Sequence, residues 1–205
     1  MIRIALTKGR IEAGAIEIFE KAGYNCSELK NKGRKLFFNI GDEIEAVLAK
    51  ANDVITYVEH GVCDVGIVGK DTIMESGNGF YEVLDLGFGK CKFALAAKKD
   101  SDFFGGYSHK VVASKYPKVA KEYFSSLGMD VEIVKIDGSV ELAPLLGLAD
   151  GIVDIVETGS TLKENGLEVV SDVAPVSARL IVNAASLKLK KDSIEKLIND
   201  IENNI

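Results

Sequence analysis

The segment from Leu148 to Leu167 most constrains the fold, because an apolar run passes directly into a turn rich in glycine and hydroxyl groups. Residues 152–156 place four aliphatic side chains around Asp154, a pattern typical of a strand buried in a sheet. Residues 157–161 (ETGST) then turn the chain, and residues 162–165 are compatible with a helix. The segment therefore predicts a strand–turn–helix unit of an α/β protein.

The turn itself has two interpretations. Backbone N–H groups at a helix start, together with the hydroxyls of Thr158, Ser160 and Thr161, suit a phosphate dianion. Gly159 would let the backbone approach such a ligand and adopt positive φ. Alternatively, the hydroxyl residues only cap the helix, since Ser and Thr are ordinary N-cap residues. The local pattern leaves both interpretations open.

Strand-like and helix-like segments alternate along the rest of the chain, which predicts mixed, mainly parallel sheets flanked by helices. The apolar patterns predict strands at residues 2–6, 36–40, 65–68 and 131–135. They predict helices at residues 11–22, 43–50, 54–60, 117–128, 140–148 and 194–201.

Two short segments share the order glycine, apolar, any residue, aspartate, apolar, namely residues 61–65 and 151–155. Each is followed by a glycine-containing loop, at Gly69 in the first case and at Gly159 in the second. This internal echo predicts two related lobes, with ligand loops at the carboxyl ends of equivalent strands. Chance similarity between two buried strands is the alternative.

Composition excludes several classes of function. The net charge of −6 and the pI near 5.1 argue against a protein that binds nucleic acid or a membrane surface. The amino-terminal apolar stretch is interrupted by Arg3, and no apolar run approaches the roughly 18 residues that span a bilayer. Cys26, Cys63 and Cys91 form no CxxC pair, which favours reduced thiols in a cytoplasmic protein.

The common nucleotide and metal motifs are also absent from the sequence. Residues 61–72 lack the first glycine of a P-loop, because Asp64 stands five residues before Gly69. His60 and His109 have no partner at metal-ligand spacing, so both are expected to be structural or surface residues and no protein zinc site is expected. If ATP binds, it binds by another route.

Several short segments carry a family resemblance, in one order along the chain. They are residues 8–10 (KGR), 34–36 (RKL), 53–71, 91–92, 116–117, 138–170 and 177–183 (SARLIVN). Together they resemble ATP phosphoribosyltransferase, and in particular its short-form catalytic subunit. Ile55 stands where the family usually has proline, and Lys50 and Lys92 stand where arginine is common. A lysine keeps the charge but loses the planar fork that grips phosphate with two parallel bonds.

The resemblance implies a two-lobed fold of the periplasmic-binding-protein type (type II). Lobe I would contain residues 1–89 and 176–205 and bind ATP, and lobe II would contain residues 90–175 and the loop for phosphoribosyl diphosphate. The implied reaction joins ATP to 5-phosphoribosyl 1-diphosphate and releases diphosphate, the first step of histidine biosynthesis. Positioning and electrostatic stabilisation would then carry most of the catalysis.

The resemblance also implies a set of site residues. Phosphoribosyl diphosphate would contact Asp154, Glu157, Thr158, Gly159, Ser160 and Thr161. ATP would contact Lys8, Gly9, Arg10, Lys50, Gly69 and Glu141. The catalytic residues would be Asp154, Lys8 and Lys50. Each acid has a simpler alternative, since Asp154 could be a buried acid bonded to nearby backbone and Glu141 a helix-start acid. Lys50 could be an ordinary solvated lysine.

Partners follow from the same resemblance. Magnesium would enter with the diphosphate, held largely by substrate oxygens and water. Because the sequence predicts only one helix after residue 183, feedback by histidine would need a separate regulator. The expected regulator resembles histidyl-tRNA synthetase, and the expected assembly is a homodimer within a hetero-oligomer.

Two other functions fit a fold of this kind. A two-lobed module that binds or senses a small molecule is the first alternative, because fold alone does not fix function. A hydroxymethylbilane-synthase-like enzyme is the second, but no cysteine in this chain is identified as the carrier of its cofactor.

Overall fold

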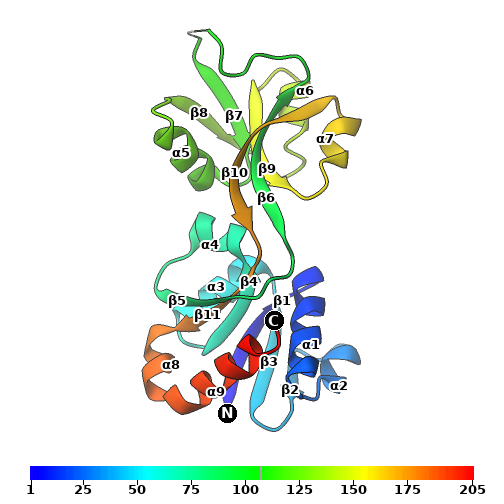
Figure 1. Ribbon diagram of the computed structural model, residues 1–205, viewed down its shortest axis with the longest axis vertical. Helices are drawn as coiled ribbons and strands as arrows, with labels where there is room; N and C mark the ends of the chain where they lie inside the picture. Colours follow the sequence, from blue (N-terminus) through cyan, green and yellow to red (C-terminus); the bar gives the residue numbers. More distant parts are fainter. Residues whose placement is uncertain (107) are drawn as a thin grey trace. The chain divides into compact units, whose positions relative to one another are not determined.

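The computed structural model describes residues 1–106 and 108–205, which fall into two compact units (Figure 1). Unit 1 comprises Met1–Gly89 and Ser177–Ile205, and unit 2 comprises Lys90–Val176. The chain returns to unit 1 between residues 176 and 177, one residue later than the boundary expected from the sequence.

Unit 1 contains a six-stranded sheet in the order β2-β3-β1-β4-β11-β5. Its strands are β1 (Ile2–Thr7), β2 (Phe37–Ile40), β3 (Ile44–Ala49), β4 (Val65–Gly69), β5 (Phe80–Asp85) and β11 (Ala178–Asn183). Its helices are α1 (Arg10–Lys21), α2 (Ser27–Lys30), α3 (Ala51–Glu59), α4 (Lys70–Ser76), α8 (Ala184–Leu189) and α9 (Lys191–Glu202). β1 pairs in parallel with β3 and β4, whereas the outer pairings are antiparallel.

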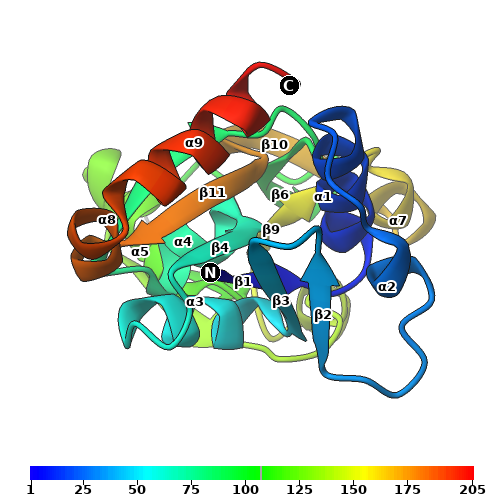
Figure 2. The ribbon, with the colours of Figure 1, turned by 90° about the horizontal axis from the view of Figure 1, so that it is seen from below.

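Helices cover both faces of this sheet (Figure 2). In β1 the side chains alternate, so Ile4 and Leu6 pack in one apolar cluster with α1 and α9, while Ala5 packs in another with α3. All three residues are fully buried. β1 therefore lies at the centre of unit 1.

Unit 2 contains a five-stranded sheet in the order β10-β6-β9-β7-β8. Its strands are β6 (Cys91–Lys98), β7 (Lys110–Ser114), β8 (Val131–Lys135), β9 (Gly151–Val156) and β10 (Leu167–Val176). Its helices are α5 (Pro117–Ser126), α6 (Leu142–Leu145) and α7 (Ser160–Glu164). β7 pairs in parallel with β8 and β9, and β6 pairs antiparallel with β9 and β10. Both sheets are mixed, and each has only two parallel pairs, a smaller share than the sequence suggested.

The two sheets repeat one strand order. In unit 1 the sequence of neighbours is β3-β1-β4-β11, and in unit 2 it is β8-β7-β9-β6. In each case the second strand of this series, β1 or β7, lies between two parallel strands. The fourth, β11 or β6, is an antiparallel strand that begins just after the chain crosses between units. β4 and β9 therefore hold equivalent positions.

The sequence echo, however, aligned the wrong residues of these strands. Asp64 immediately precedes β4, whereas Asp154 is the fourth residue of β9. The equivalent of Asp64 is Asp150. Asp64 donates its N–H to the Arg3 carbonyl and accepts the Arg3 N–H through Oδ2, each at 2.8 Å. Asp150 makes the same two bonds with Val111, also at 2.8 Å each.

The turns before these aspartates match as well. Gly61 and Gly147 both adopt positive φ, 68° and 77°. Each donates its N–H to a carbonyl three residues earlier, at 3.1 Å. Because Gly147 rather than Gly151 matches Gly61, the register of the echo shifts by four residues, and Asp154 then corresponds to Val68.

Three sequence predictions of elements were wrong. Residues 43–50 were expected to be helical, but residues 44–49 form β3, which pairs with β1 on one side and β2 on the other. Glu, Ala and Leu favour helices, and the two flanking strands override that preference. The helix expected at residues 140–148 is only Leu142–Leu145, and the carboxyl end forms two helices, α8 and α9, rather than one.

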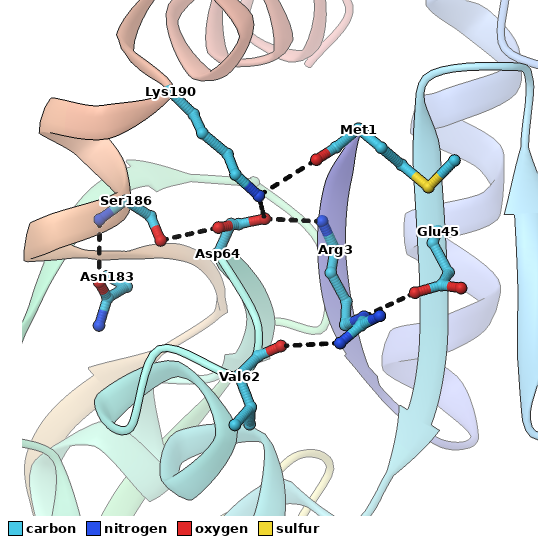
Figure 3. Close-up of polar contacts among 8 residues, drawn as sticks. All are labelled: Met1, Arg3, Glu45, Val62, Asp64, Asn183, Ser186 and Lys190. Atoms are coloured by element: carbon cyan, nitrogen blue, oxygen red, sulfur yellow. Dashed lines mark hydrogen bonds and ion pairs between the residues drawn. The ribbon is translucent and has the colours of Figure 1, made fainter.

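A buried carboxylate joins the amino ends of β1 and β4 to the carboxyl-terminal helices (Figure 3). Asp64 is only 5% exposed, and it accepts hydrogen bonds from the Arg3 N–H, the Ser186 hydroxyl (2.7 Å) and the Lys190 ammonium (2.7 Å). Lys190 also donates to the Met1 carbonyl at 3.1 Å. Four segments of unit 1 therefore meet at one side chain.

Asn183 places Ser186 opposite this carboxylate. As the N-cap of α8, its Oδ1 accepts the N–H groups of Ala185 at 3.0 Å and Ser186 at 2.9 Å. Burial by itself would raise the pKa of Asp64, but the bonds from Arg3, Lys190 and Ser186 outweigh it, and the pKa lies below its ordinary value.

Asp64→Asn should destabilise the protein by about 1–3 kcal/mol at pH 7, because Lys190 and Ser186 lose a charged acceptor. Since the folded pKa is depressed, this contribution is full above the unfolded pKa, about 3.9, and disappears as pH falls through the folded pKa. Urea unfolding of both proteins across this pH range measures it. Glu43→Gln, which removes an exposed pair with Lys196, is the control and should change stability by less than about 1 kcal/mol. A difference for Asp64→Asn that persists unchanged at the lowest pH would contradict the role of the charge.

Candidate active site

Unit 2 contains a pocket of about 350 Å³ at the carboxyl end of β9. It is lined by Glu141, Ile152, Asp154, Ile155, Val156, Glu157, Thr158, Gly159, Ser160, Thr161 and Leu162. Every residue that the sequence assigned to phosphoribosyl diphosphate therefore lies in one pocket. Glu141, which was assigned to ATP, lies there too, at the N-cap of α6.

Asp154 interrupts an otherwise apolar face of β9. Ile152, Asp154 and Val156 point to the same side of the sheet, because side chains alternate along a strand. Ile152 and Val156 are buried there with Leu162 of α7. The equivalent residue of unit 1 is Val68, which is fully buried. The fold thus accepts a valine at this position in unit 1, where unit 2 has an acid that lines the pocket.

The turn after β9 takes the conformation that the sequence predicted. Gly159 is the N-cap of α7 and adopts φ 73° and ψ 7°, a left-handed conformation that glycine accepts without strain. A Cβ built there would meet nothing closer than 3.8 Å, so the conformation rather than crowding requires glycine.

The hydroxyls of this turn also bond to one another. The Thr158 and Ser160 hydroxyls lie 3.0 Å apart, and the Ser160 N–H donates to the Thr158 Oγ1 at 3.4 Å. The N-cap is Gly159 and no side chain caps α7, so these hydroxyl residues do not act as its N-cap. The same hydroxyls line the pocket and are exposed, so a ligand phosphate could meet them there.

The remaining predicted residues gather in unit 1, at the carboxyl ends of adjacent parallel strands. Lys8 follows β1, Lys50 follows β3, and Gly69 ends β4. The register pairs Thr7 with Ala49, and the Lys8 N–H donates to the Ala49 carbonyl at 3.0 Å. Lys8 and Lys50 therefore leave the sheet at the same edge, where open α/β sheets bind ligands.

Local backbone geometry fits a ligand site at this edge. Gly9 is the N-cap of α1 with φ 91°, and a Cβ built on it would meet nothing within 4 Å. A Cβ on Gly69 would lie 2.0 Å from Asp71 Oδ1, so a side chain there would displace Asp71. Lys8, Arg10 and Lys50 are all exposed, which makes this edge a basic surface for anions.

The sequence analysis did not predict two sets of polar contacts near this edge. Lys70 and Arg179 both pair with Glu82, at 2.5 Å and 3.2 Å. Glu12 bonds the N–H of Gly9 and the ammonium of Lys32. The spacing of Glu12, three residues after Gly9, is a capping-box signal that could have been found in the sequence.

Of the other basic residues, Arg34 lies exposed between α2 and β2, and Lys92 pairs with Asp172 at 2.5 Å in unit 2. Within residues 1–106 and 108–205, no three His, Cys, Asp or Glu side chains form a group that could hold a metal ion. No helix of the described chain is both long enough and apolar enough to cross a membrane.

Known proteins match this chain over most of its length. A family model described as "HisG: ATP phosphoribosyltransferase" matches residues 50–203. The ATP phosphoribosyltransferase of Clostridium kluyveri is 66% identical over 202 residues, which cover 98% of this chain and 92% of the relative. That of Clostridium acetobutylicum is 59% identical over 205 residues, covering 100% and 95%.

The chain belongs to the ATP phosphoribosyltransferase family. Membership at this identity gives its activity as an enzyme, a pentosyltransferase that condenses ATP with phosphoribosyl diphosphate in the first step of histidine biosynthesis.

Solved structures confirm the fold class. An ATP phosphoribosyl transferase (HisG:HisZ) complex from Thermotoga maritima includes a chain with a TM-score of 0.81 and 30% identity, covering 99% of this chain and 98% of that one. The periplasmic aliphatic sulphonate binding protein SsuA from Escherichia coli has a TM-score of 0.61 at 12% identity, covering 99% and 72%. The second likeness shows the fold alone, a two-lobed type II fold.

Proposed function

We propose that the pocket of unit 2 binds phosphoribosyl diphosphate and that the basic edge of unit 1 binds ATP in this transfer. The observation that carries the proposal is the coincidence of Asp154 and the whole Glu157–Thr161 turn in one pocket. The 5′-phosphate of the ribose would bind the hydroxyls and N–H groups of Thr158, Gly159, Ser160 and Thr161. Glu141 lies in the same pocket and would face the ribose or the incoming adenine.

Asp154 would stabilise the transition state. When the bond between carbon 1 and the diphosphate oxygen breaks, the electron pair leaves with the diphosphate and positive charge develops on the ribose, as in glycoside chemistry. The carboxylate of Asp154 would favour this charge and accept hydrogen bonds from ribose hydroxyls. Nitrogen 1 of the adenine supplies the electron pair of the new bond, so no covalent enzyme intermediate is required.

Lys8, Arg10 and Lys50 would bind the ATP phosphates or the leaving diphosphate. They leave the carboxyl edge of the unit 1 sheet on neighbouring elements, and the exposed backbone of Gly9 lies between two of them. Gly69 ends the neighbouring strand and would allow close approach of the nucleotide. Lys50 carries charge where the family often has arginine, so its contact would involve single bonds rather than a fork.

Magnesium would enter with the diphosphate, largely held by substrate oxygens and water. Phosphate and water oxygens are ligands that magnesium prefers, so the ion would need no dedicated group of protein carboxylates. When bound, the ion would neutralise charge on the diphosphate.

A regulatory subunit completes the proposal. The Thermotoga maritima structure is a complex of HisG with HisZ. By analogy, this chain would work in the cytoplasm as a homodimer within a hetero-oligomer that includes a subunit resembling histidyl-tRNA synthetase. A module that only binds or senses a small molecule remains the alternative that the SsuA likeness would permit, and the 66% identity to a transferase argues against it.

Gly159→Val should weaken binding of phosphoribosyl diphosphate by about tenfold or more, because valine resists the left-handed conformation that shapes the turn. Gly166→Val is the matched control, since Gly166 has nearly the same φ of 69° and no atom near its Cβ but does not line the pocket. Calorimetric titration of both folded variants measures the affinities. Equal affinities in the two variants would contradict the assignment of the pocket.

Diphosphate release tests the function and its partner together. The chain mixed with the regulatory subunit should release diphosphate only when ATP and phosphoribosyl diphosphate are both present, because the reaction joins them. The chain alone should turn over more slowly and should not respond to histidine, since feedback needs a second site coupled to the first. Release from either substrate by itself would rule out the transfer, and full histidine-sensitive activity of the chain alone would rule out the need for the partner.

A further inference from the structure

We propose that Glu12 is a positioning residue for the turn formed by Lys8, Gly9 and Arg10, with Lys32 as its counter-charge. The inference rests on the proposed function, because it takes this turn to be part of the ATP site. Glu12 would act through the backbone of the turn and would not itself touch the nucleotide.

Two bonds hold the Glu12 carboxylate in place. One oxygen, Oε2, accepts the N–H of Gly9 at 3.3 Å, and the other, Oε1, accepts the ammonium of Lys32 at 2.6 Å. The Glu12 side chain is only 7% exposed, whereas that of Lys32 is 45% exposed. The carboxylate is thus buried between the turn and the segment that joins α2 to β2.

The bond to Gly9 fixes the peptide that joins Lys8 to Gly9, because a peptide unit is planar and its N–H direction sets the orientation of the whole unit. Gly9 has φ 91°, and a glycine backbone can adopt many other conformations. Without the bond from Glu12, the turn would therefore be less ordered. Holding this peptide sets the directions in which Lys8 and Arg10 leave the backbone. Such pre-organisation reduces the entropy lost when a ligand binds.

Two features distinguish this contact from an ordinary helix cap. A capping Glu usually reaches back over a solvent-exposed first turn, whereas Glu12 is buried and bonds a lysine twenty residues away. A buried carboxylate beside a site for a polyanion would also repel the ligand unless it is neutralised. Lys32 supplies that neutralisation, and it ties the turn to the segment that carries Arg34.

The first experiment compares Glu12→Ala with Glu12→Gln. Alanine removes the acceptor for Gly9, and the dissociation constant of magnesium-ATP should rise about tenfold, while that of phosphoribosyl diphosphate changes less than about twofold. Glutamine keeps a carbonyl acceptor and should restore most of the ATP affinity. Glu17→Ala is the matched control on α1, because Glu17 pairs with Lys21 at 3.0 Å on an exposed face, and it should change neither constant.

The second experiment does not depend on the folding of Glu12→Ala. Lys32→Met leaves the Glu12 carboxylate without its counter-charge and should weaken ATP binding several-fold. Adding Glu12→Gln to Lys32→Met removes the unpaired charge and should recover part of the lost ATP affinity. The effects of the two substitutions on ATP affinity would then be non-additive. A purely structural role would not confine this non-additivity to ATP affinity. Urea unfolding of each variant separates binding from stability.

The outcomes separate this inference from the proposed function. If the wild-type chain binds both substrates and Glu12→Ala and Lys32→Met bind ATP as the wild type does, Glu12 does not position the turn. Equal weakening of both substrates would also overturn the inference. If the wild-type chain binds no ATP, the proposed function fails before Glu12 is tested.

Discussion

In each unit one aspartate, immediately before β4 or β9, ties two parallel strands together. Asp64 bonds the backbone of Arg3 in β1 through its N–H and its carboxylate, Asp150 bonds Val111 in β7 in the same way, and these bonds set the register of each strand pair. In unit 1 the same carboxylate also binds Ser186 and Lys190, so the carboxyl-terminal helices are fixed to the sheet. This register also positions the carboxyl ends of β4 and β9, next to the loops that are proposed to bind ligands.

The same register distinguishes Asp64 and Asp150, which tie strands together, from Asp154, the acid proposed to act in the transfer. Asp154 lies four residues beyond Asp150, at a position where unit 1 has Val68. Its neighbours on the same face, Ile152 and Val156, are buried aliphatic side chains. The repeated architecture thus supplies an internal comparison, in which the proposed catalytic acid stands where the equivalent strand has an aliphatic residue.

The sequence predicted those features that depend on neighbouring residues in the chain. The strand–turn–helix at Asp154 and the positive φ of Gly159 followed from residue types alone, because few residues accept that conformation. β3 could not be predicted, since its residues favour a helix and only the flanking strands make it a strand. The residue of unit 2 that is equivalent to Asp64 could not be identified from the sequence. Residues 147–150 and 151–154 both match the order glycine, apolar, any residue, aspartate, and only the hydrogen bonds distinguish them. The Glu12–Lys32 contact depends on a fold that brings distant segments together.

The most direct test compares Asp154→Asn with Asp150→Asn, by turnover with both substrates saturating and by urea unfolding. The account predicts that Asp154→Asn lowers kcat about 100-fold or more, because the proposed role of this carboxylate is to stabilise the charge that develops on the ribose. Asp150→Asn should instead lower stability by about 1 kcal/mol and leave the kcat of folded protein near the wild-type value. Wild-type turnover in Asp154→Asn, or equal loss of turnover in the two variants, would contradict the account.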